Sequence, residues 1–598
     1  MSKKKKKQLT EHKLSPYSLF LLLPLFLLII FYPLLFKYVI YSNPLADFSF
    51  FTPSDTLSDL FCYCKKYMLY VIAILMLVCF VSYVIKNYKT TSVFLKTQPK
   101  VFLVLPVYML LVFLSACFSE YRDIAFGGMP GQFESVFVLL CYPVIFLFSY
   151  WYLSTQAQQK TVCVFLIIQM LLVGMICMMQ TAGIDPYYEI YASRGASKSV
   201  AGVYGAFSNP NYLGSYVALV LPLAIAFLIL YFKDTVMRLV TLFIVVMLAV
   251  ALFSSKTIGG LLACACTLVL ALLLLFFRKK KVSFGKCLGV FAGCIALLAL
   301  GCTMFYLRYD KPIDTEYSIL RAIYTNEDNL EIHYRNETLY VYANTTDTDF
   351  QLVCTDETGA PLELNIVNSR YHFADPRFED LIITPMIFSD LNQMIGFSFT
   401  TRYDMPLWYF TNNYNGDAYY YITSTGQFMQ ITADNYSDGV LFHNMELLSG
   451  RGFIWSRSIP LLKKSLLLGS GADTFVFYFP NDDYVTAFQA GFVNTLITKP
   501  HNMYLQIAIQ NGIPALLLFL VLYLYYFFGS IKLYLNANLR TASSSKETLI
   551  GFCIFLGTFG YMVIGMVNDS SLTVAPFFWF LLGCGYALNK KIAVSNRL

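Results

Sequence analysis

LVTLFIVVMLAVALF, residues 239–253, and IGGLLACACTLVLALLLLFF, residues 258–277, decide the fold class of this chain. Neither run contains a charged residue, and only Ser-Ser-Lys-Thr separates them. A helix rises about 1.5 Å per residue and the hydrocarbon core of a bilayer is about 30 Å thick, so apolar blocks of this kind are typical of transmembrane helices. The two runs therefore predict a pair of membrane-spanning helices joined by a very short turn.

Blocks of the same kind recur along most of the chain. Of its 598 residues, 57% are hydrophobic and 13% are charged, which is about half the charged share of a soluble domain. The pattern predicts an all-α polytopic membrane protein with about twelve transmembrane helices. The expected spans are residues 17–40, 67–85, 101–118, 135–153, 161–180, 212–232, 239–253, 258–277, 287–307, 513–528, 549–567 and 572–588.

Lysine and arginine residues in the short connections predict the orientation, because positive segments resist translocation. The run from Lys3 to Lys7 anchors the N-terminus in the cytoplasm, and the positive residues of alternate loops place the C-terminus on the same side of the cytoplasmic membrane. The first apolar block lacks a small-residue cleavage site and is expected to remain as a helix. Because the lysine run is explained as an anchor, no nucleic-acid partner is expected. The exceptions, which lie at outer helix ends and are candidates for function, are Lys65, Lys66, Arg122 and Lys256.

The longest polar segment lies outside, between the ninth and tenth expected spans. In its first part, apolar residues occupy every second position, as at Leu330, Ile332 and Tyr334, which is the period of half-buried strands. Its second part, with Phe453-Ile454-Trp455, looks helical and amphipathic and is expected to lie on or dip into the bilayer surface. The expected organisation is a cytoplasmic basic tail (1–16), nine spans (17–307), a β-rich extracytoplasmic insert (314–444), an outer loop with amphipathic helices (445–511), three spans (512–588) and a cytoplasmic tail (589–598).

His501 is the sharpest single candidate for chemistry. It is one of only five histidines and lies in Lys499-Pro500-His501-Asn502, where the outer loop re-enters the membrane. A histidine can be neutral near pH 7 and take a proton from an attacking hydroxyl, which is the task of a general base. The alternative is a histidine that caps the following helix or sits at the lipid interface.

Two further positive residues could bind phosphate. Arg451, in Ser449-Gly-Arg-Gly, carries a guanidinium fork that suits phosphate oxygens, but it could also be a snorkelling interfacial arginine. Lys256 lies so close to lipid that either a phosphate partner or an outward-snorkelling side chain is expected.

Asn209-Pro210-Asn211 comes directly before the sixth expected span. Asparagine side chains bond the free amides of a first helical turn and proline fixes the backbone, so the tripeptide is suited to cap a membrane helix. A helix start at the outer face could also receive an anionic headgroup. The fifteen cysteines have no paired metal-binding spacing, and no nucleotide-loop or His-Glu-x-x-His pattern occurs, so neither a metal nor a cofactor is expected.

Several segments follow one another along the chain: Tyr121-Arg-Asp-Ile-Ala-Phe-Gly-Gly-Met-Pro-Gly-Gln, Gly205-Ala-Phe-Ser-Asn-Pro-Asn-Tyr-Leu, Ser255-Lys256, Ser449-Gly-Arg-Gly-Phe-Ile-Trp, Gly469-Ser-Gly-Ala-Asp473-Thr-Phe, His501-Asn502-Met-Tyr-Leu-Gln-Ile-Ala and Asn511-Gly-Ile-Pro. Taken in this order, they resemble the O-antigen ligase and polymerase superfamily. The resemblance covers nearly the whole chain except the β-rich insert.

The resemblance implies an inverting, metal-independent glycosyltransferase of the GT-C type in cell-surface polysaccharide biosynthesis. Residues 445–511 would be its catalytic loop. Its donor would be an undecaprenyl-pyrophosphate-linked glycan, and its acceptor a glycan or glycolipid. Carried over by position, His501 would be the base and Arg451 would bind the pyrophosphate, together with Lys256 and either Arg194 or Arg122. The family often has an arginine where this chain has Gly202 and another where it has Lys256, and Arg194 could replace the first.

The alternative function is a transporter or a lipid-linked oligosaccharide flippase, which also needs about twelve spans. Such proteins often show internal repeats, broken helices and charges near the bilayer midplane. The sequence shows no internal repeat, and its notable charges lie at the outer face. Both features favour the transferase. Whether it ligates a finished glycan or polymerises repeat units stays open, because the two reactions share donor chemistry.

Overall fold

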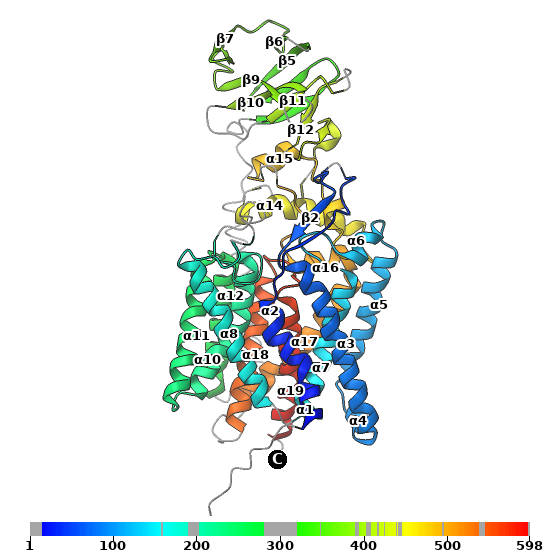
Figure 1. Cartoon of the computed structure of the whole chain (residues 1–598), viewed down its shortest axis with the longest axis vertical. Coiled ribbons are helices and arrows are strands. Elements are labelled where there is room, and N and C mark those ends of the chain that lie inside the picture. The colour runs from blue at the N-terminus through cyan, green and yellow to red at the C-terminus, as the bar shows by residue number, and fades with distance from the viewer. Residues whose placement is uncertain are drawn as a thin grey trace, which may run out of the picture.

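A helical bundle carries a β-rich unit at one of its ends (Figure 1). The computed structural model describes residues 15–48, 50–156, 159–188, 190, 202–279, 320–346, 349–388, 394–401, 408–414, 418–423, 425–437, 439–440, 445, 447–492, 495–536 and 544–595. The long helices stand roughly side by side, and the shorter helices of the outer loop lie between them and the sheets (Figure 1).

Ten helices within the described residues are long and apolar enough to cross a membrane, and each overlaps one expected span. The first combines α1 (Pro16–Phe26), η1 (Leu27–Phe31) and α2 (Tyr32–Leu34), and the third combines η2 (Lys100–Leu103) and α5 (Val104–Cys117). The others are α3 (Cys62–Lys86), α7 (Val136–Thr155), α8 (Gln159–Thr181), α10 (Pro210–Leu230), α11 (Thr235–Ser254), α12 (Ile258–Lys279), α17 (Ile513–Asn536) and α18 (Ser544–Ile564).

Two of the twelve expected spans, the ninth and the twelfth, are not among these ten helices. The ninth, 287–307, lies outside the described residues. The twelfth, 572–588, corresponds to α19 (Ala575–Ser595), which is buried at every residue from Ala575 to Leu588 and packs against α7 in the interior of the bundle. Ten of the predicted spans are therefore confirmed as membrane-length helices, and α19 is an interior helix.

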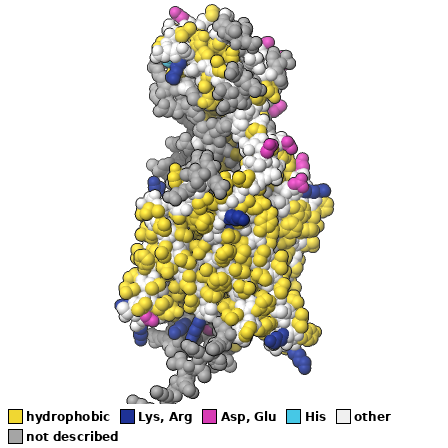
Figure 2. Space-filling view, viewed as in Figure 1, with side chains coloured by type: hydrophobic (Ala, Val, Ile, Leu, Met, Phe, Trp, Pro, Cys, Tyr) yellow, Lys and Arg dark blue, Asp and Glu magenta, His cyan; other side chains and the backbone are white. Residues whose placement is uncertain are grey.

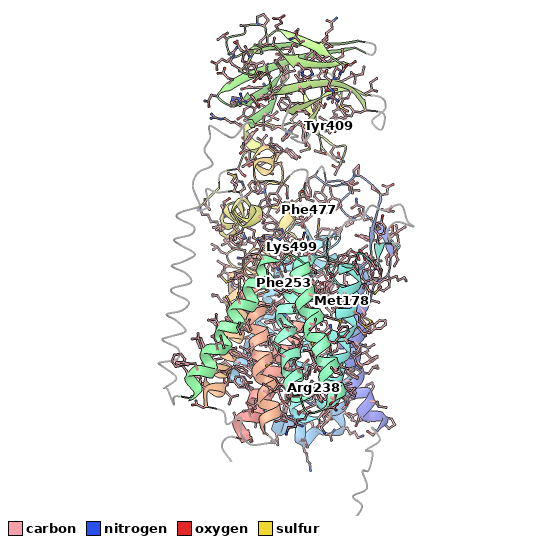
Figure 3. The ribbon with its side chains drawn as sticks, turned by 90° about the vertical axis from the view of Figure 1, so that its left-hand side faces the viewer. Met178, Arg238, Phe253, Tyr409, Phe477 and Lys499 are labelled. Atoms are coloured by element: carbon pink, nitrogen blue, oxygen red, sulfur yellow. The ribbon has the colours of Figure 1, made fainter. Side chains whose placement is uncertain are left out.

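The surface of the bundle agrees with a membrane location. On the face shown in Figure 2, hydrophobic side chains form a broad band across the bundle, and lysine and arginine side chains gather mainly above and below that band. Arg238 and Lys499 lie at opposite ends of the helices (Figure 3). The chain is a multi-pass membrane protein.

The β-rich unit consists of two antiparallel meanders. The predicted alternation of buried apolar side chains is confirmed, since Leu330, Ile332, Tyr334, Leu339 and Val341 all lie in the core between the two sheets. The four-stranded sheet has the order β3 (Leu320–Thr325), β4 (Leu330–Tyr334), β5 (Glu337–Thr346) and β6 (Asp349–Asp356). The seven-stranded sheet runs from β7 (Leu364–Val367) through β8 (Arg370–Phe373), β9 (Leu381–Phe388), β10 (Met394–Thr401), β11 (Trp408–Thr411) and β12 (Tyr420–Ile422) to β13 (Phe428–Met429).

Short helices of the outer loop connect the sheets to the bundle. Phe453 and Ile454 are fully buried in a cluster with Phe475 and Phe479, so the apolar side of this segment packs against the protein itself. The expectation that it faces the bilayer surface is wrong for these two residues. The loop elements are α14 (Leu447–Ser458), η4 (Ile459–Lys463), η5 (Phe475–Phe477), α15 (Tyr484–Gln489) and α16 (Met503–Asn511), and η3 (Ala433–Asn435) precedes them at the end of the insert. The same end of the bundle also carries β1 (Val39–Ser42), β2 (Thr56–Asp59) and α6 (Arg122–Gly127). The short helix α4 (Tyr88–Lys96) follows α3.

Candidate active site

The segment between α18 and α19, residues 565–574, joins the elements of the candidate site. Asn502 caps the start of α16 by accepting from the backbone amides of Tyr504 and Leu505, and its Nδ2 donates to the Met566 carbonyl. The backbone amide of Met503 donates to the carbonyls of Gly565 and Asn568. The start of α16 is thereby fixed against this segment, which we call the α18–α19 loop.

His501 and Asp569 form a hydrogen-bonded pair. The Nδ1 atom of His501 lies 2.7 Å from Oδ2 of Asp569, and the other carboxylate oxygen accepts the backbone amide of Asn502. Only 2% of the Asp569 side chain is exposed, whereas 42% of the His501 side chain is exposed. With Nδ1–H donated to the carboxylate, Nε2 keeps a lone pair that can accept a proton, which is the arrangement of an oriented general base.

Backbone strain accompanies this geometry. His501 has a φ of 49°, and Ser449 and Asp473 have φ values of 61° and 58°. Such left-handed conformations cost free energy in residues other than glycine and are found where the surrounding structure enforces them, often at functional sites. The bonds from the α18–α19 loop supply that enforcement at His501.

Arg451 lies against the same loop. Its Nε donates to the Val567 carbonyl at 2.9 Å and its Nη1 donates to the Leu448 carbonyl at 2.8 Å. Burial lowers the pKa of Arg451, and the nearby negative charge of Asp569 opposes that shift. Among the described residues, Nη2 has no hydrogen-bond partner. The guanidinium is therefore held in place by two bonds and retains a donor for an anion.

A buried charge network lies behind the His501–Asp569 pair. Lys499 donates to the Ser570 carbonyl at 2.9 Å and its ammonium lies 3.6 Å from Oε2 of Glu134. Burial alone lowers the pKa of Lys499, but the acidic groups around it, Tyr212 first and then Glu134 and Asp473, raise it above its ordinary value. Lys499 is therefore a charged ammonium that ties the α18–α19 loop to the start of α7.

Glu134 and Asp473 complete this network. Glu134 accepts from Tyr142, from the Ser570 hydroxyl and from Gln506 at 2.7, 2.6 and 3.1 Å. Asp473 accepts the backbone amides of Met129 and Glu134, and burial raises its pKa to about 6 despite the nearby Lys499. Below the network is a cavity of about 30 Å³ lined by Glu134, Gln506, Gln510, Asn511, Ser570 and aromatic side chains, which has room for one or two water molecules.

Two motifs of the outer loop pack directly on each other beside the network. The amides of Ser470 and Gly471 donate to the carbonyls of Ile509 and Gln510, at 2.9 and 2.8 Å. A methyl group at Gly469 would overlap the Gln510–Asn511 backbone. The glycine is required by this close approach, which places residues 469–471 against the end of α16.

Asn209 and Asn211 lie where the sequence predicts, at the start of α10. Asn209 is the N-cap, and its side chain accepts the Asn211 amide at 2.8 Å. The Asn211 carbonyl accepts from Asn568 of the α18–α19 loop at 3.1 Å. Both asparagines therefore serve the structure of the helix start and its contact with the loop.

Among the described residues, no hydrogen bond or ion pair joins Lys256 or Arg122 to the His501–Asp569 pair. Lys256 is exposed in the α11–α12 turn, and Gly259, three residues later, contacts Val567, the residue whose carbonyl binds Arg451. Arg122 is exposed at the start of α6. Arg194 lies outside the described residues. Lys65 and Lys66 are buried and donate to the carbonyls of Ala206 and Gly127, so they hold these two segments in place.

A bundle of membrane-length helices with an oriented histidine and an arginine at one end defines a multi-pass membrane protein with a candidate acid–base site. Residues 407–520 match the family model described as O-antigen ligase. This match confirms the resemblance to the O-antigen ligase superfamily and supports an O-antigen-ligase-like, glycosyltransferase-like function in polysaccharide synthesis. No curated protein and no solved structure matches the chain.

The matched segment contains Arg451, His501 and Asn502, and it ends in α17. It begins at residue 407, inside the insert, whereas the resemblance seen in the sequence excludes the insert. Asp569, Glu134 and Lys499 were missed as site residues. A signal for Asp569 was present, because Asn568-Asp569-Ser570-Ser571 is a polar run between two apolar spans on the expected outer side. No spacing rule connects it to His501.

Proposed function

We propose that this protein transfers or polymerises glycan from an undecaprenyl-pyrophosphate carrier onto an acceptor hydroxyl at the outer face of the cytoplasmic membrane. The observation that carries the proposal is the His501–Asp569 pair, with Arg451 bonded to the same α18–α19 loop. His501 and Arg451 lie inside the segment similar to O-antigen ligases, and Asp569 lies beyond it. Residues 445–511 act as the catalytic loop, and the N- and C-termini lie in the cytoplasm.

In the proposed reaction, the acceptor hydroxyl attacks the anomeric carbon of the donor sugar. Its proton passes to Nε2 of His501, while Asp569 holds the ring through Nδ1 and stabilises the imidazolium that forms. The bond from the anomeric carbon to the pyrophosphate breaks, and the lipid pyrophosphate leaves. A single displacement inverts the anomeric configuration and needs no metal in this scheme.

Arg451 binds the departing pyrophosphate in this proposal. Its guanidinium is oriented by the Val567 and Leu448 carbonyls before substrate arrives, so little reorganisation accompanies the growth of charge on the leaving group. Lys256 adds positive charge at the neighbouring helix end, and Arg122 or Arg194 is a further candidate. Asn209, Asn211 and Asn502 position the site by fixing the backbone at the starts of α10 and α16.

The test compares lipid-linked and surface glycans in a deletion strain that carries either wild-type protein or His501→Ala at equal abundance. We expect the variant to accumulate undecaprenyl-linked glycan on the outer leaflet and to lose the surface polymer. The length of the accumulated glycan then distinguishes ligation from polymerisation. Accumulation on the inner leaflet instead would identify a flippase, and unchanged surface glycan would refute the role of His501.

Replacing Arg451 by lysine should lower transfer about tenfold to a hundredfold. Lysine keeps the positive charge but loses the fork and the bonds that orient it, and charge-assisted hydrogen bonds contribute about 1.5–3 kcal/mol each. Initial rates against donor concentration in detergent would measure the effect. The exposed residue Lys464, replaced by arginine, serves as the matched control and should leave the rate unchanged. An Arg451→Lys enzyme with the wild-type rate would exclude pyrophosphate binding by the fork.

A further inference from the structure

The insert contains a cavity that the transfer reaction does not use. It measures about 380 Å³, within the range of about 300–1,000 Å³ that small-molecule sites occupy. It lies where β5 and β6 of the four-stranded sheet meet the turns at the ends of β11 and β12 of the seven-stranded sheet. Its lining includes Glu327, Asp328, Tyr342, Gln351, Asn412 and Tyr419.

The floor of this cavity is fixed by hydrogen bonds between the two sheets. The Ala343 amide of β5 donates to the Tyr419 hydroxyl at 2.7 Å, and Nδ2 of Asn412 donates to the Ala343 carbonyl at 2.6 Å. The Tyr419 amide donates to the Asn326 carbonyl at 2.9 Å, next to Glu327. These bonds hold the lining in one arrangement before any ligand binds, which reduces the entropic cost of binding.

The rim has a composition suited to sugars. Tyr342 is 37% exposed and offers part of an aromatic ring, while Gln351, Glu327 and Asp328 are exposed polar side chains. Amide and carboxylate groups hydrogen-bond hydroxyl and amino groups, and an aromatic ring packs on apolar C–H faces. The two carboxylates disfavour a phosphate or another anion. Within the described residues, no group of three or more metal-ligating side chains occurs, so a metal site is not indicated.

The insert is joined firmly to the outer loop that carries the candidate active site. Nε2 of Gln489 in α15 donates to the Leu320 carbonyl of β3 at 2.6 Å, and the α15 residue Tyr484 packs on Tyr421 of β12 with 5.0 Å between ring centroids. The insert stands at the same end of the bundle as Lys499 (Figures 1 and 3). A chain held in the cavity would thus be held at the end of the protein where transfer takes place.

We infer that the cavity between β5, β6 and the residues Asn412 and Tyr419 binds a neutral or amino-sugar oligosaccharide, as a second glycan site separate from His501. The inference rests on the proposed function only in assigning this oligosaccharide to the acceptor or product chain. Holding a chain there raises its effective concentration at the transfer site.

The test uses purified full-length protein in detergent and fluorescence polarisation. The probe is an oligosaccharide mixture cut from the surface polysaccharide of the producing cell and labelled at its reducing end. Tyr342→Ala and the double variant Glu327→Gln/Asp328→Asn should each weaken binding about tenfold, the size of a lost contact or hydrogen bond. The double variant Glu357→Gln/Glu363→Gln changes exposed carboxylates of the same insert outside the cavity and should bind as the wild type does.

His501→Ala separates this inference from the proposed function. It should bind the labelled oligosaccharide with unchanged affinity while losing transfer. Cavity variants that bind like the wild type would overturn the inference and leave the transferase proposal intact. Binding that requires added Ca²⁺, or that an anionic oligosaccharide shares equally, would also overturn it, because the cavity would then be a cation site or an unselective surface.

Discussion

An Asp569→Asn variant is expected to lose about 10²–10⁴-fold in the rate of glycan transfer while remaining folded. The carboxylate accepts Nδ1–H of His501 at 2.7 Å and stabilises the positive ring that forms when Nε2 takes the acceptor proton. An amide of the same shape can present an N–H to Nδ1 instead, which moves the ring proton to Nε2 and removes the base. The buried position and its bond from the Asn502 amide favour retention of the backbone geometry.

The measurement is kcat and KM for the lipid-linked donor with purified protein in detergent. Because Asp569 acts through His501, the variant should lower kcat and change the donor KM little, whereas general loosening of the site would change both. Asp569→Glu, which keeps the charge, should recover part of the rate. Asp482→Asn, at an exposed carboxylate of the same outer loop, is the matched control and should behave as wild type. A wild-type kcat for Asp569→Asn would show that the pair is structural.

The spans were predictable because the thickness of the hydrocarbon core fixes the length of an apolar block. The runs 239–253 and 258–277 accordingly became α11 and α12, with the turn at Lys256 between them. The alternation from Leu330 to Val341 was equally local, since each second side chain of a strand faces the same core. Both predictions depend only on neighbouring residues.

The site was only partly predictable because its contacts connect distant parts of the chain. His501 and Arg451 were found through residue type and order, but Asp569 lies 68 residues after His501 and in a different loop. Similarly, nothing local indicates that the Phe453–Ile454 face packs on Phe475 and Phe479 and not on lipid. An amphipathic pattern shows that a face must be buried, and tertiary packing decides what buries it.

Lys499 is expected to be the residue whose loss most destabilises the end of the bundle that carries the candidate site. Its ammonium lies 3.6 Å from Glu134, is 4% exposed and donates to the Ser570 carbonyl of the α18–α19 loop. Removing one partner of a buried charge pair costs about 3–5 kcal/mol, because the other charge stays buried without compensation. Lys499→Met should therefore lower the free energy of unfolding in detergent by about that amount.

A double-mutant cycle distinguishes the charge pair from simple loss of packing. Glu134→Gln keeps the oxygen that accepts from Tyr142 and Ser570 but removes the charge, so Lys499→Met/Glu134→Gln should recover much of the stability lost in Lys499→Met alone. Lys464→Met, at an exposed lysine, is the control and should stay within about 0.5 kcal/mol of wild type. If the losses of the two single variants simply add, the pair contributes no coupling. The orientation of Asp569 would then depend on the other bonds to the α18–α19 loop, which include those from Asn502, Met503 and Arg451.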